Sequence, residues 1–353
     1  MNFFTLRKVT VAMLVGAQSS LIAQAAPGPA PAPAPTPLTV SGVMFGQYAY
    51  ALRNPAGTGH QNNFDITRAY LNFLGKWSGG VGGRVTADVY RNADGSLAFR
   101  LKYGFASYNP RGGPLTYKLG MLQTPFVEYD ENLWDYRMQG QDPTDRAGYL
   151  SSSDIGMAVD GSWSGDKVTM SSGVYNGEFY SKAPGDKHKD VAARVSVRLA
   201  PSDEGGRFGG FRLTGFTLLG KPNGGGTRQR FLGQASYRSK RVTVGAFLMS
   251  TRDRTDTGTV ALPTVSGRVA SVLAVVRFPA SKLAAIGRVD IHDRNTALPN
   301  DRLTRLIAGL SYQLNPNLRV LGDFEHTSYQ GGAPTPALDA ARSQALFQIQ
   351  LVF

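Results

Sequence analysis

Basic side chains recur at alternate positions of short segments spread over most of the sequence. A residue at every second position lies on one face of a β-strand, and these side chains share one parity within each segment. They are Arg68, Arg84, Arg100, Lys102, Lys118, Arg194, Arg198, Arg230, Arg288, Arg305 and Arg319. Fewer acids fall on the same face: Asp88, Asp154, Asp160, Asp290, Asp323 and Glu325. The chemistry that this pattern permits is attraction of anions, because rings of Arg or Lys around an aqueous path favour them.

A second charged group lies in one insert, residues 125–152, and is mainly acidic. Its members are Glu128, Asp130, Glu131, Asp135, Arg137, Asp142, Asp145 and Arg146. If the insert faces the basic strands, it sets up a transverse field that orients dipolar solutes. Two other interpretations stay open: the insert is a solvated loop outside, or wall pairs such as Arg84 with Asp88 and Arg288 with Asp290 only stabilise each other.

Catalytic and cofactor signals are weak. The histidines have no HExxH or paired spacing, so we expect no metal site; they are His60, His188, His292 and His326. The run GGVGGR at 79–84 lacks the GK[ST] ending of a phosphate loop. A hydrolase would need a serine and a histidine in contact, for which Ser311 and His326 are the candidates. The sequence therefore predicts no catalytic residue, no cofactor and no enzyme. Because the arginines are dispersed, we also expect no nucleic-acid partner.

Sixteen segments with two-residue alternation account for the chain after Leu38, and no helix-length window has a 3.6-residue period. The predicted strands are 38–52, 63–77, 82–92, 96–109, 114–123, 153–163, 167–177, 188–200, 210–220, 228–238, 240–251, 265–278, 281–292, 302–313, 317–328 and 343–353. Short turns follow nearly every even strand, and longer connections follow the odd ones. Short turns on one side, long loops on the other and an even strand number are typical of a transmembrane antiparallel β-barrel.

The two faces of the predicted strands differ in polarity. In the fourth strand, apolar side chains from Leu97 to Phe105 at odd positions, Tyr103 included, oppose Arg100 and Lys102. An Arg or Lys facing lipid at mid-bilayer costs about 2–4 kcal/mol, against a net stability of about 5–15 kcal/mol for a domain. The basic face must then line an interior, which sixteen strands leave open as a channel. The alternative is an exported β-sandwich binding protein, whose apolar face would be its core.

The first residues look like targeting and spacer segments. Arg7 and Lys8 precede a short apolar run and the sequence Ala23-Gln24-Ala25, which predicts a signal peptide at 1–25. The alternating prolines of 26–37 predict a Pro/Ala-rich periplasmic spacer, followed by a barrel domain at 38–353. The chain has 353 residues, no cysteine and a net charge of +13. No stretch approaches the about 18 apolar residues of a membrane-spanning helix.

The residues that resemble a known family are ITRAYLNFLGKW (66–77), YKLGMLQTPFVEYD (117–130), DIGMAVDGSWSG (154–165), GVYNGEFY (173–180) and DVAARVSVRLAP (190–201). In this order they resemble the phosphate-selective (O/P type) porins of the bacterial outer membrane. That resemblance implies sixteen strands, a third loop folded into the lumen and a homotrimer surrounded by outer-membrane lipid. It also implies that the aromatic closing strand ending at Phe353 is read by the barrel-assembly machinery.

The insert departs from that family in one respect, because it contains no lysine. The resemblance implies lysines at the constriction of the phosphate-specific members. We therefore expect passive passage of small hydrophilic solutes with a mild anion preference. The alternative is a phosphate or polyphosphate channel with a binding site in the constriction.

Overall fold

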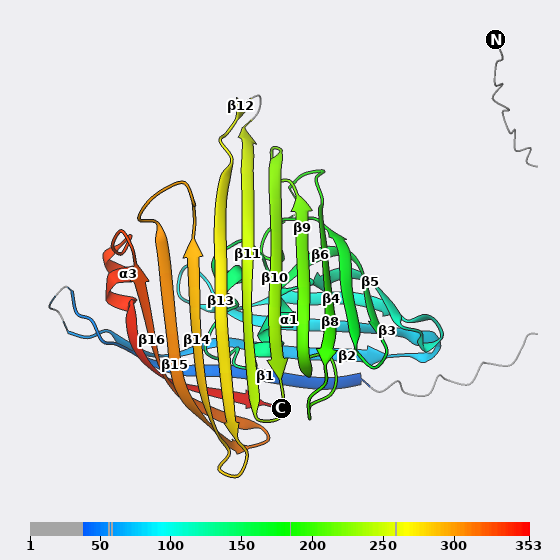
Figure 1. Ribbon diagram of the computed structural model, residues 1–353, viewed down its shortest axis with the longest axis horizontal. Coiled ribbons are helices and arrows are strands. Elements are labelled where there is room, and N and C mark those ends of the chain that lie inside the picture. Colours follow the sequence, from blue (N-terminus) through cyan, green and yellow to red (C-terminus); the bar gives the residue numbers. More distant parts are fainter. Residues whose placement is uncertain (1–37, 56, 58, 184, 258–259) are drawn as a thin grey trace, which may run out of the picture. The chain divides into compact units, whose positions relative to one another are not determined.

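The computed structural model describes residues 38–55, 57, 59–183, 185–257 and 260–353. The predicted signal peptide and spacer lie outside the described residues. Within them, one antiparallel sheet winds into a closed ring of sixteen strands, with a short additional strand β12 on its rim. Closure comes from pairing of the first and last strands, from Val43 opposite Val352 to Ala51 opposite Gln344 (Figure 1).

The strands follow the predicted segments closely, since two-residue periodicity is a direct readout of the pleat. They are β1 (Leu38–Ala51), β2 (Asn62–Lys76), β3 (Val81–Arg91), β4 (Leu97–Tyr108), β5 (Leu115–Gln123), β6 (Ser153–Trp163), β7 (Val168–Tyr175), β8 (Asp190–Ala200), β9 (Gly210–Gly220), β10 (Gly226–Arg238), β11 (Val242–Thr257), β12 (Val260–Ala261), β13 (Val265–Phe278), β14 (Leu283–Asp293), β15 (Arg302–Asn315), β16 (Leu318–Tyr329) and β17 (Ser343–Val352). The prediction was wrong at β11, which continues past residue 251 and pairs with β12.

The final residue is tied into the sheet by its backbone. Phe353 donates a hydrogen bond to the carbonyl of Gly42 at 3.0 Å and accepts one from the Gly42 amide at 2.7 Å. A side chain at position 42 would meet the Phe353 ring, at 2.3 Å from its Cβ. The terminal aromatic ring therefore lies over a glycine that leaves room for it.

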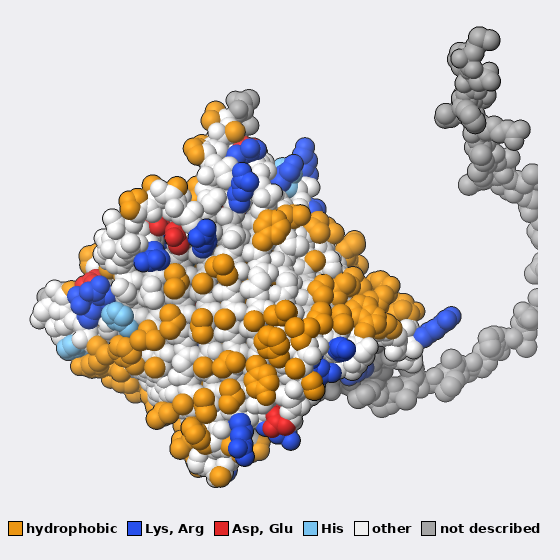
Figure 2. Space-filling model, viewed as in Figure 1, with side chains coloured by type: hydrophobic (Ala, Val, Ile, Leu, Met, Phe, Trp, Pro, Cys, Tyr) orange, Lys and Arg blue, Asp and Glu red, His pale blue; other side chains and the backbone are white. Residues whose placement is uncertain are grey.

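The outer face of the ring is apolar. Phe99, Leu119 and Leu310 point outward and are 74%, 64% and 63% exposed. Figure 2 shows hydrophobic side chains over much of the visible wall, with many of the Lys and Arg near strand ends. Buried Arg194 and Arg212 lie on the opposite, inward face. An apolar exterior around a charged interior is the reverse of a soluble sandwich and suits lipid as solvent, so the predicted transmembrane β-barrel architecture is confirmed.

A β-bulge changes the inward set on β4. The β3–β4 register shifts between Thr86 and Ala87, so that Lys102 is the extra residue. Because an inserted residue reverses the alternation, Tyr103 is only 3% exposed and faces inward with Lys102. Phe105 also faces inward, where the Lys118 ammonium lies 5.1 Å from its ring. The outward assignment of Tyr103 and Phe105 was therefore wrong.

The described residues contain three short α-helices, two of them in the long connection after β5. These are α1 (Val127–Trp134), α2 (Pro143–Arg146) and α3 (Pro336–Ala341). Asp142 caps α2 by accepting from the Thr144 and Asp145 amides, while α3 belongs to the connection between β16 and β17. Among the described residues, no helix is long and apolar enough to cross a membrane.

Candidate functional site

The connection between β5 and β6, called here the inner loop (residues 124–152), packs on the inside of the barrel through apolar side chains. Phe126 is fully buried, with its ring 5.6 Å from that of Phe216 on β9 and 5.5 Å from that of Phe247 on β11. Trp134 is 1% exposed and joins a cluster with Leu273 and Leu321. These two clusters therefore pack the inner loop against the inside of the wall.

Arginines of the barrel wall hold the inner loop by its backbone carbonyls. Arg194 Nε donates to the carbonyl of residue 125 at 2.8 Å, Arg288 Nη2 to that of residue 141 at 3.2 Å, and Arg319 Nη1 to that of residue 135 at 2.7 Å. Arg230 reaches the carbonyl of residue 149 at 3.4 Å. Four of the eleven predicted pore-lining residues therefore position the inner loop.

The inner loop reaches the wall opposite its attachment. The Tyr136 hydroxyl lies 2.7 Å from Ser311 Oγ on β15, and Gln139 donates to Glu325 on β16 at 3.0 Å. Gln348 on β17 donates to the carbonyl of residue 138 at 3.0 Å. Since the loop leaves from β5 and also meets β15 to β17, it crosses the lumen and narrows it.

The basic side chains of β2 to β4 form a separate cluster, in which Asp88 is the shared anion. Arg68 and Arg100 both bind Asp88, at 3.2 and 2.9 Å. Lys102 Nζ donates to the Tyr70 hydroxyl at 3.1 Å and has no ion pair with any described carboxylate. Arg84 pairs with Glu128 of the inner loop at 3.6 Å, so the proposed Arg84–Asp88 pair was wrong. The Arg288–Asp290 pair is confirmed, at 2.8 Å.

A cavity of about 300 Å³ separates this basic wall from α1 of the inner loop. Arg84 and Lys102 line it on the wall side, and Glu128, Glu131 and Asp135 line it on the loop side. Opposite charges on two sides of an opening of molecular size produce a transverse field, least screened where the opening is narrower than the Debye length of about 8 Å. We call this cavity the eyelet.

The remaining predicted residues lie outside the basic wall of the eyelet and are engaged by neighbours. Lys118 pairs with Asp160 at 2.6 Å, and Arg305 pairs with Glu325 at 2.8 Å. Arg198 donates to the carbonyl of Gly165 at 3.0 Å, in the short turn after β6. On the inner loop, Arg137 lines the eyelet and pairs with Glu131 at 2.6 Å, so the two charges compensate each other. Arg146 lies 3.8 Å from Glu325.

Two acids predicted for the constriction are buried within the inner loop. Asp130 and Asp142 are each 1% exposed. Asp130 accepts a hydrogen bond from Gln234, and Asp142 accepts from the Thr144 and Asp145 amides. Burial raises the pKa of both, and the charge of Asp130 raises that of Asp142 further. The acids that line the eyelet are therefore Glu128, Glu131 and Asp135. Each is paired with a base: Arg84 for Glu128, Arg137 for Glu131, and Arg277 and Arg319 for Asp135.

The Asp145 carboxyl of the inner loop changes its charge near neutral pH. Burial raises the pKa of its carboxyl to about 6, and the charges of Glu131 and Asp142 act in the same direction, against Arg137 and Lys102. A carboxyl with a raised pKa is neutral below that value and charged above it.

Acidification should therefore increase anion preference. Between about pH 7.5 and pH 5, loss of the Asp145 charge should raise the anion-to-cation permeability ratio about twofold, measured from reversal potentials. Asp145→Asn should show a smaller change of the ratio between the two pH values. Asp94→Asn is the matched control, because hydrogen bonds from Ser96 lower the pKa of Asp94 in an exposed turn. An equal pH response in D145N would contradict the assignment.

Several inward residues escaped the sequence patterns. Phe216 and Phe247 face inward although the inner face was expected to be polar, and Arg212 is fully buried, donating to the carbonyl of Gly206 at 3.0 Å. Strands β9 to β11 carry apolar residues at both odd and even positions. This is the one sequence signal that could have shown where the inner loop packs against the wall. The inward orientation of Tyr103 could not be predicted from the alternation, because the bulge at Lys102 reverses it.

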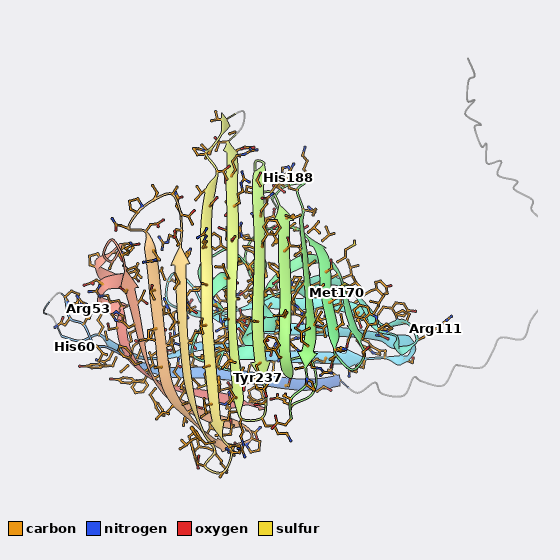
Figure 3. The ribbon with its side chains drawn as sticks, in the orientation of Figure 1. Arg53, His60, Arg111, Met170, His188 and Tyr237 are labelled. Carbon is orange, nitrogen blue, oxygen red and sulfur yellow. The ribbon has the colours of Figure 1, made fainter. Side chains whose placement is uncertain are left out.

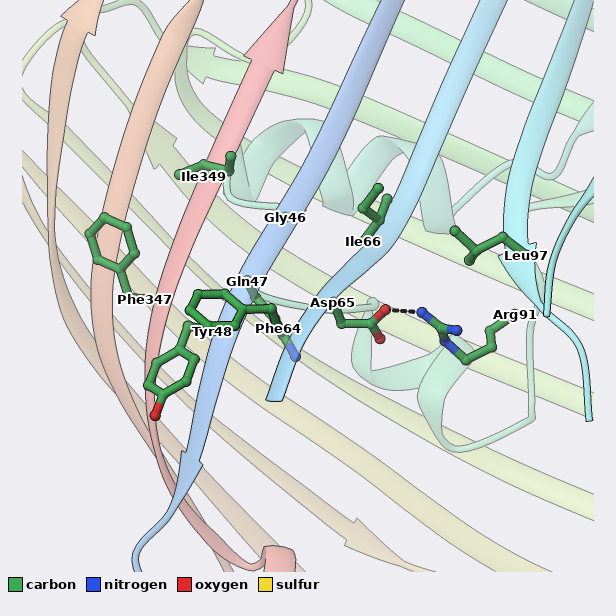
Figure 4. Close-up of a pocket in the computed structure, with 10 residues that line it drawn as sticks. All are labelled: Gly46, Gln47, Tyr48, Phe64, Asp65, Ile66, Arg91, Leu97, Phe347 and Ile349. Atoms are coloured by element: carbon green, nitrogen blue, oxygen red, sulfur yellow. Dashed lines mark hydrogen bonds and ion pairs between the residues drawn. The ribbon is translucent and has the colours of Figure 1, made fainter. Parts of the chain in front are cut away.

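An apolar cavity of about 450 Å³ lies on the outer face, where β17, β1 and β2 meet. Tyr48 and Phe64 pack with ring centroids 4.7 Å apart, beside Phe347, and Arg91 pairs with Asp65 at one end (Figure 4). Because its aromatic lining faces outward, this cavity is not part of the interior path.

The described residues offer no metal cluster, and they do not bring Ser311 and His326 together. His60 and His188 lie in different loops far apart (Figure 3). In the β15–β16 register Ser311 is opposite Leu321, whereas His326 is opposite Leu306. His326 contacts Ser343 instead, at 2.7 Å. The predicted contact between Ser311 and His326 is therefore wrong.

No protein-family model matches the sequence, and no curated protein does either. Solved structures do match. An anion-selective porin from Comamonas acidovorans has 14% identity and a TM-score of 0.67, with 90% of this chain and 100% of that chain covered. OmpF of Salmonella typhi, in complex with daunomycin, has 15% identity, a TM-score of 0.66 and coverage of 90% and 97%.

A mutant of Rh. blastica porin gives 15% identity, a TM-score of 0.56 and coverage of 90% and 100%. The described barrel therefore has the fold of the bacterial porins, with sixteen strands.

Proposed function

We propose that the protein is an outer-membrane porin that lets small hydrophilic solutes diffuse passively, with a mild preference for anions. The observation that carries this proposal is the eyelet, where Arg84 and Lys102 face the acids of α1 across the narrowed lumen. The apolar exterior and the porin fold support a place in the outer membrane. Passive diffusion needs no catalytic group, and none is proposed.

The anion preference follows from how the charges are compensated. Arg68 and Arg100 share a single carboxylate, Asp88. Lys102 has an aromatic neighbour, its Nζ lying 4.4 Å from the centre of the Tyr70 ring, but no carboxylate partner among the described residues. The wall of β2 to β4 therefore keeps more positive charge than its own acids cancel, and a permeating anion would meet it.

A phosphate-specific channel is the second candidate, and it receives less support. The Lys102 ammonium and the Arg84 guanidinium could bind one phosphate together, but Arg84 already pairs with Glu128. The inner loop adds three carboxylates to the same cavity, which would repel a dianion. Micromolar phosphate should therefore leave the conductance unchanged.

We further propose a homotrimer, embedded in outer-membrane lipid and assembled by the barrel-assembly machinery through the strand that ends at Phe353. The outward aromatic surface of β17, β1 and β2 supports this assembly state, since Phe64 and Phe347 are 85% and 53% exposed. Aromatic side chains of that size are typical of buried interface cores.

Single-channel recording of the purified protein in planar bilayers tests the proposal. In asymmetric KCl the reversal potential should have the sign of a chloride preference, and phosphate at micromolar concentration should not block the current. A cation preference would overturn the charge assignment, phosphate block would favour the second candidate, and absence of channels would overturn the porin function itself.

A further inference from the structure

A second interior cavity, of about 410 Å³, lies on the other side of the inner loop from the eyelet, at the end of the barrel that carries the long loops. Residues 143–149 of the inner loop form one side, and β13 to β16 with Leu338 of α3 form the other. We call it the vestibule pocket. Its size falls in the range of small-molecule sites, about 300–1,000 Å³.

Positive charge exceeds negative charge around this pocket. Arg146, Arg294 and Arg305 line it. Arg146 and Arg305 share one carboxylate, Glu325. Arg294 is exposed and forms no ion pair with a described carboxylate. The lining acid Asp290 is already neutralised by Arg288 at 2.8 Å and accepts from Ser271 at 2.7 Å.

The rest of the lining is apolar or aromatic. Leu303, Leu338 and Val269 contribute aliphatic surface, and Tyr149 and Tyr329 contribute rings. The Tyr149 ring is fixed edge-on against His292, with centroids 5.3 Å apart, and its hydroxyl lies 3.4 Å from His292 Nε2. A fixed ring and aliphatic walls beside an uncompensated guanidinium suit a ligand with one anionic end and one apolar end.

From this lining we infer that the vestibule pocket binds small organic carboxylates with an apolar or aromatic body. The carboxylate would pair with the fork of Arg294, a geometry that guanidinium groups favour, while the body would lie against Leu303 and the tyrosine rings. Inorganic anions would gain only the charge contact. The inference deepens the proposed function, on which its physiological meaning rests, by naming a solute class held before the eyelet.

Fluorine NMR of fluorobenzoate with the detergent-solubilised full chain tests this site without requiring transport. We expect saturable line broadening in the millimolar range, reversed by benzoate at least about tenfold better than by acetate at equal ionic strength, because acetate lacks the ring. Arg294→Gln should weaken binding about tenfold, and Leu303→Ala should weaken benzoate more than acetate. Arg254→Gln is the matched control, an arginine of the β11 extension outside the pocket.

Each outcome of the experiment either supports the proposed binding site or overturns it. Absence of saturation, equal displacement by acetate and benzoate, or unchanged binding in R294Q would overturn the site. If the protein conducts ions but fails these tests, the proposed porin function stands and the proposed binding site is wrong. If the protein binds fluorobenzoate but forms no channel, the binding site is supported and the proposed porin function is wrong.

Discussion

Replacing Arg84 and Lys102 together with glutamine should abolish the anion preference of the channel and turn it toward cations. At about 6 Å in water, one unit charge changes the energy of a permeating ion by about 0.7 kcal/mol, or about threefold in permeability. Because each charge acts in opposite senses on an anion and a cation, loss of two wall charges should lower the anion-to-cation permeability ratio by up to about a hundredfold. Glu128, Glu131 and Asp135 would remain on the opposite side of the eyelet.

Arg198→Gln, which removes one charge rather than two, is the control for loss of positive charge outside the eyelet. Its side chain is occupied by the Gly165 carbonyl in a turn, away from the residues that line the eyelet. Its permeability ratio should stay within about 1.5-fold of the unmodified protein. Equal shifts in the two variants would show that net charge, rather than the eyelet, sets selectivity.

Trp134→Ala should widen the channel. The side chain is 1% exposed within the cluster that holds the inner loop, and truncating a buried tryptophan costs about 3–5 kcal/mol. Trp134 is the largest side chain of that cluster, which also contains Tyr136 and Met138 of the inner loop. The second half of the inner loop should therefore loosen from the wall, while Phe126 holds the first half in place. We expect single-channel conductance to rise by at least about half and current noise to increase.

The control for that variant removes the same side chain from the other face of the wall. Trp163 lies on β6 and is 36% exposed on the outside, so Trp163→Ala should leave conductance unchanged. Heat-dependent mobility on gels would show that both variants keep a closed barrel. A normal conductance in W134A, with the barrel intact, would show that the inner loop is held by its arginine contacts instead.

The sequence by itself determined the strands, the two faces of the wall and the location of the longest insert. Alternation between apolar and polar residues is a local property, because each side chain in a pleated strand points opposite to its neighbours. That is why Arg68, Arg194 and Arg288 could be placed on the inner face before any contact was known. It is also why the alternation misassigned Tyr103, since the bulge at Lys102 reverses it without changing composition.

Only the tertiary structure decided which inward charges face open space. Arg194, Arg230, Arg288 and Arg319 look equivalent to Arg84 in a strand pattern, yet their guanidinium groups are engaged by backbone carbonyls of the inner loop. Those contacts join residues far apart in sequence, such as 135 and 319, because closing the ring brings every strand within reach of one crossing segment. Alternation along a strand carries no information about what lies across the lumen. Selectivity depends on how far each inward charge lies from the groups on the opposite side of the lumen.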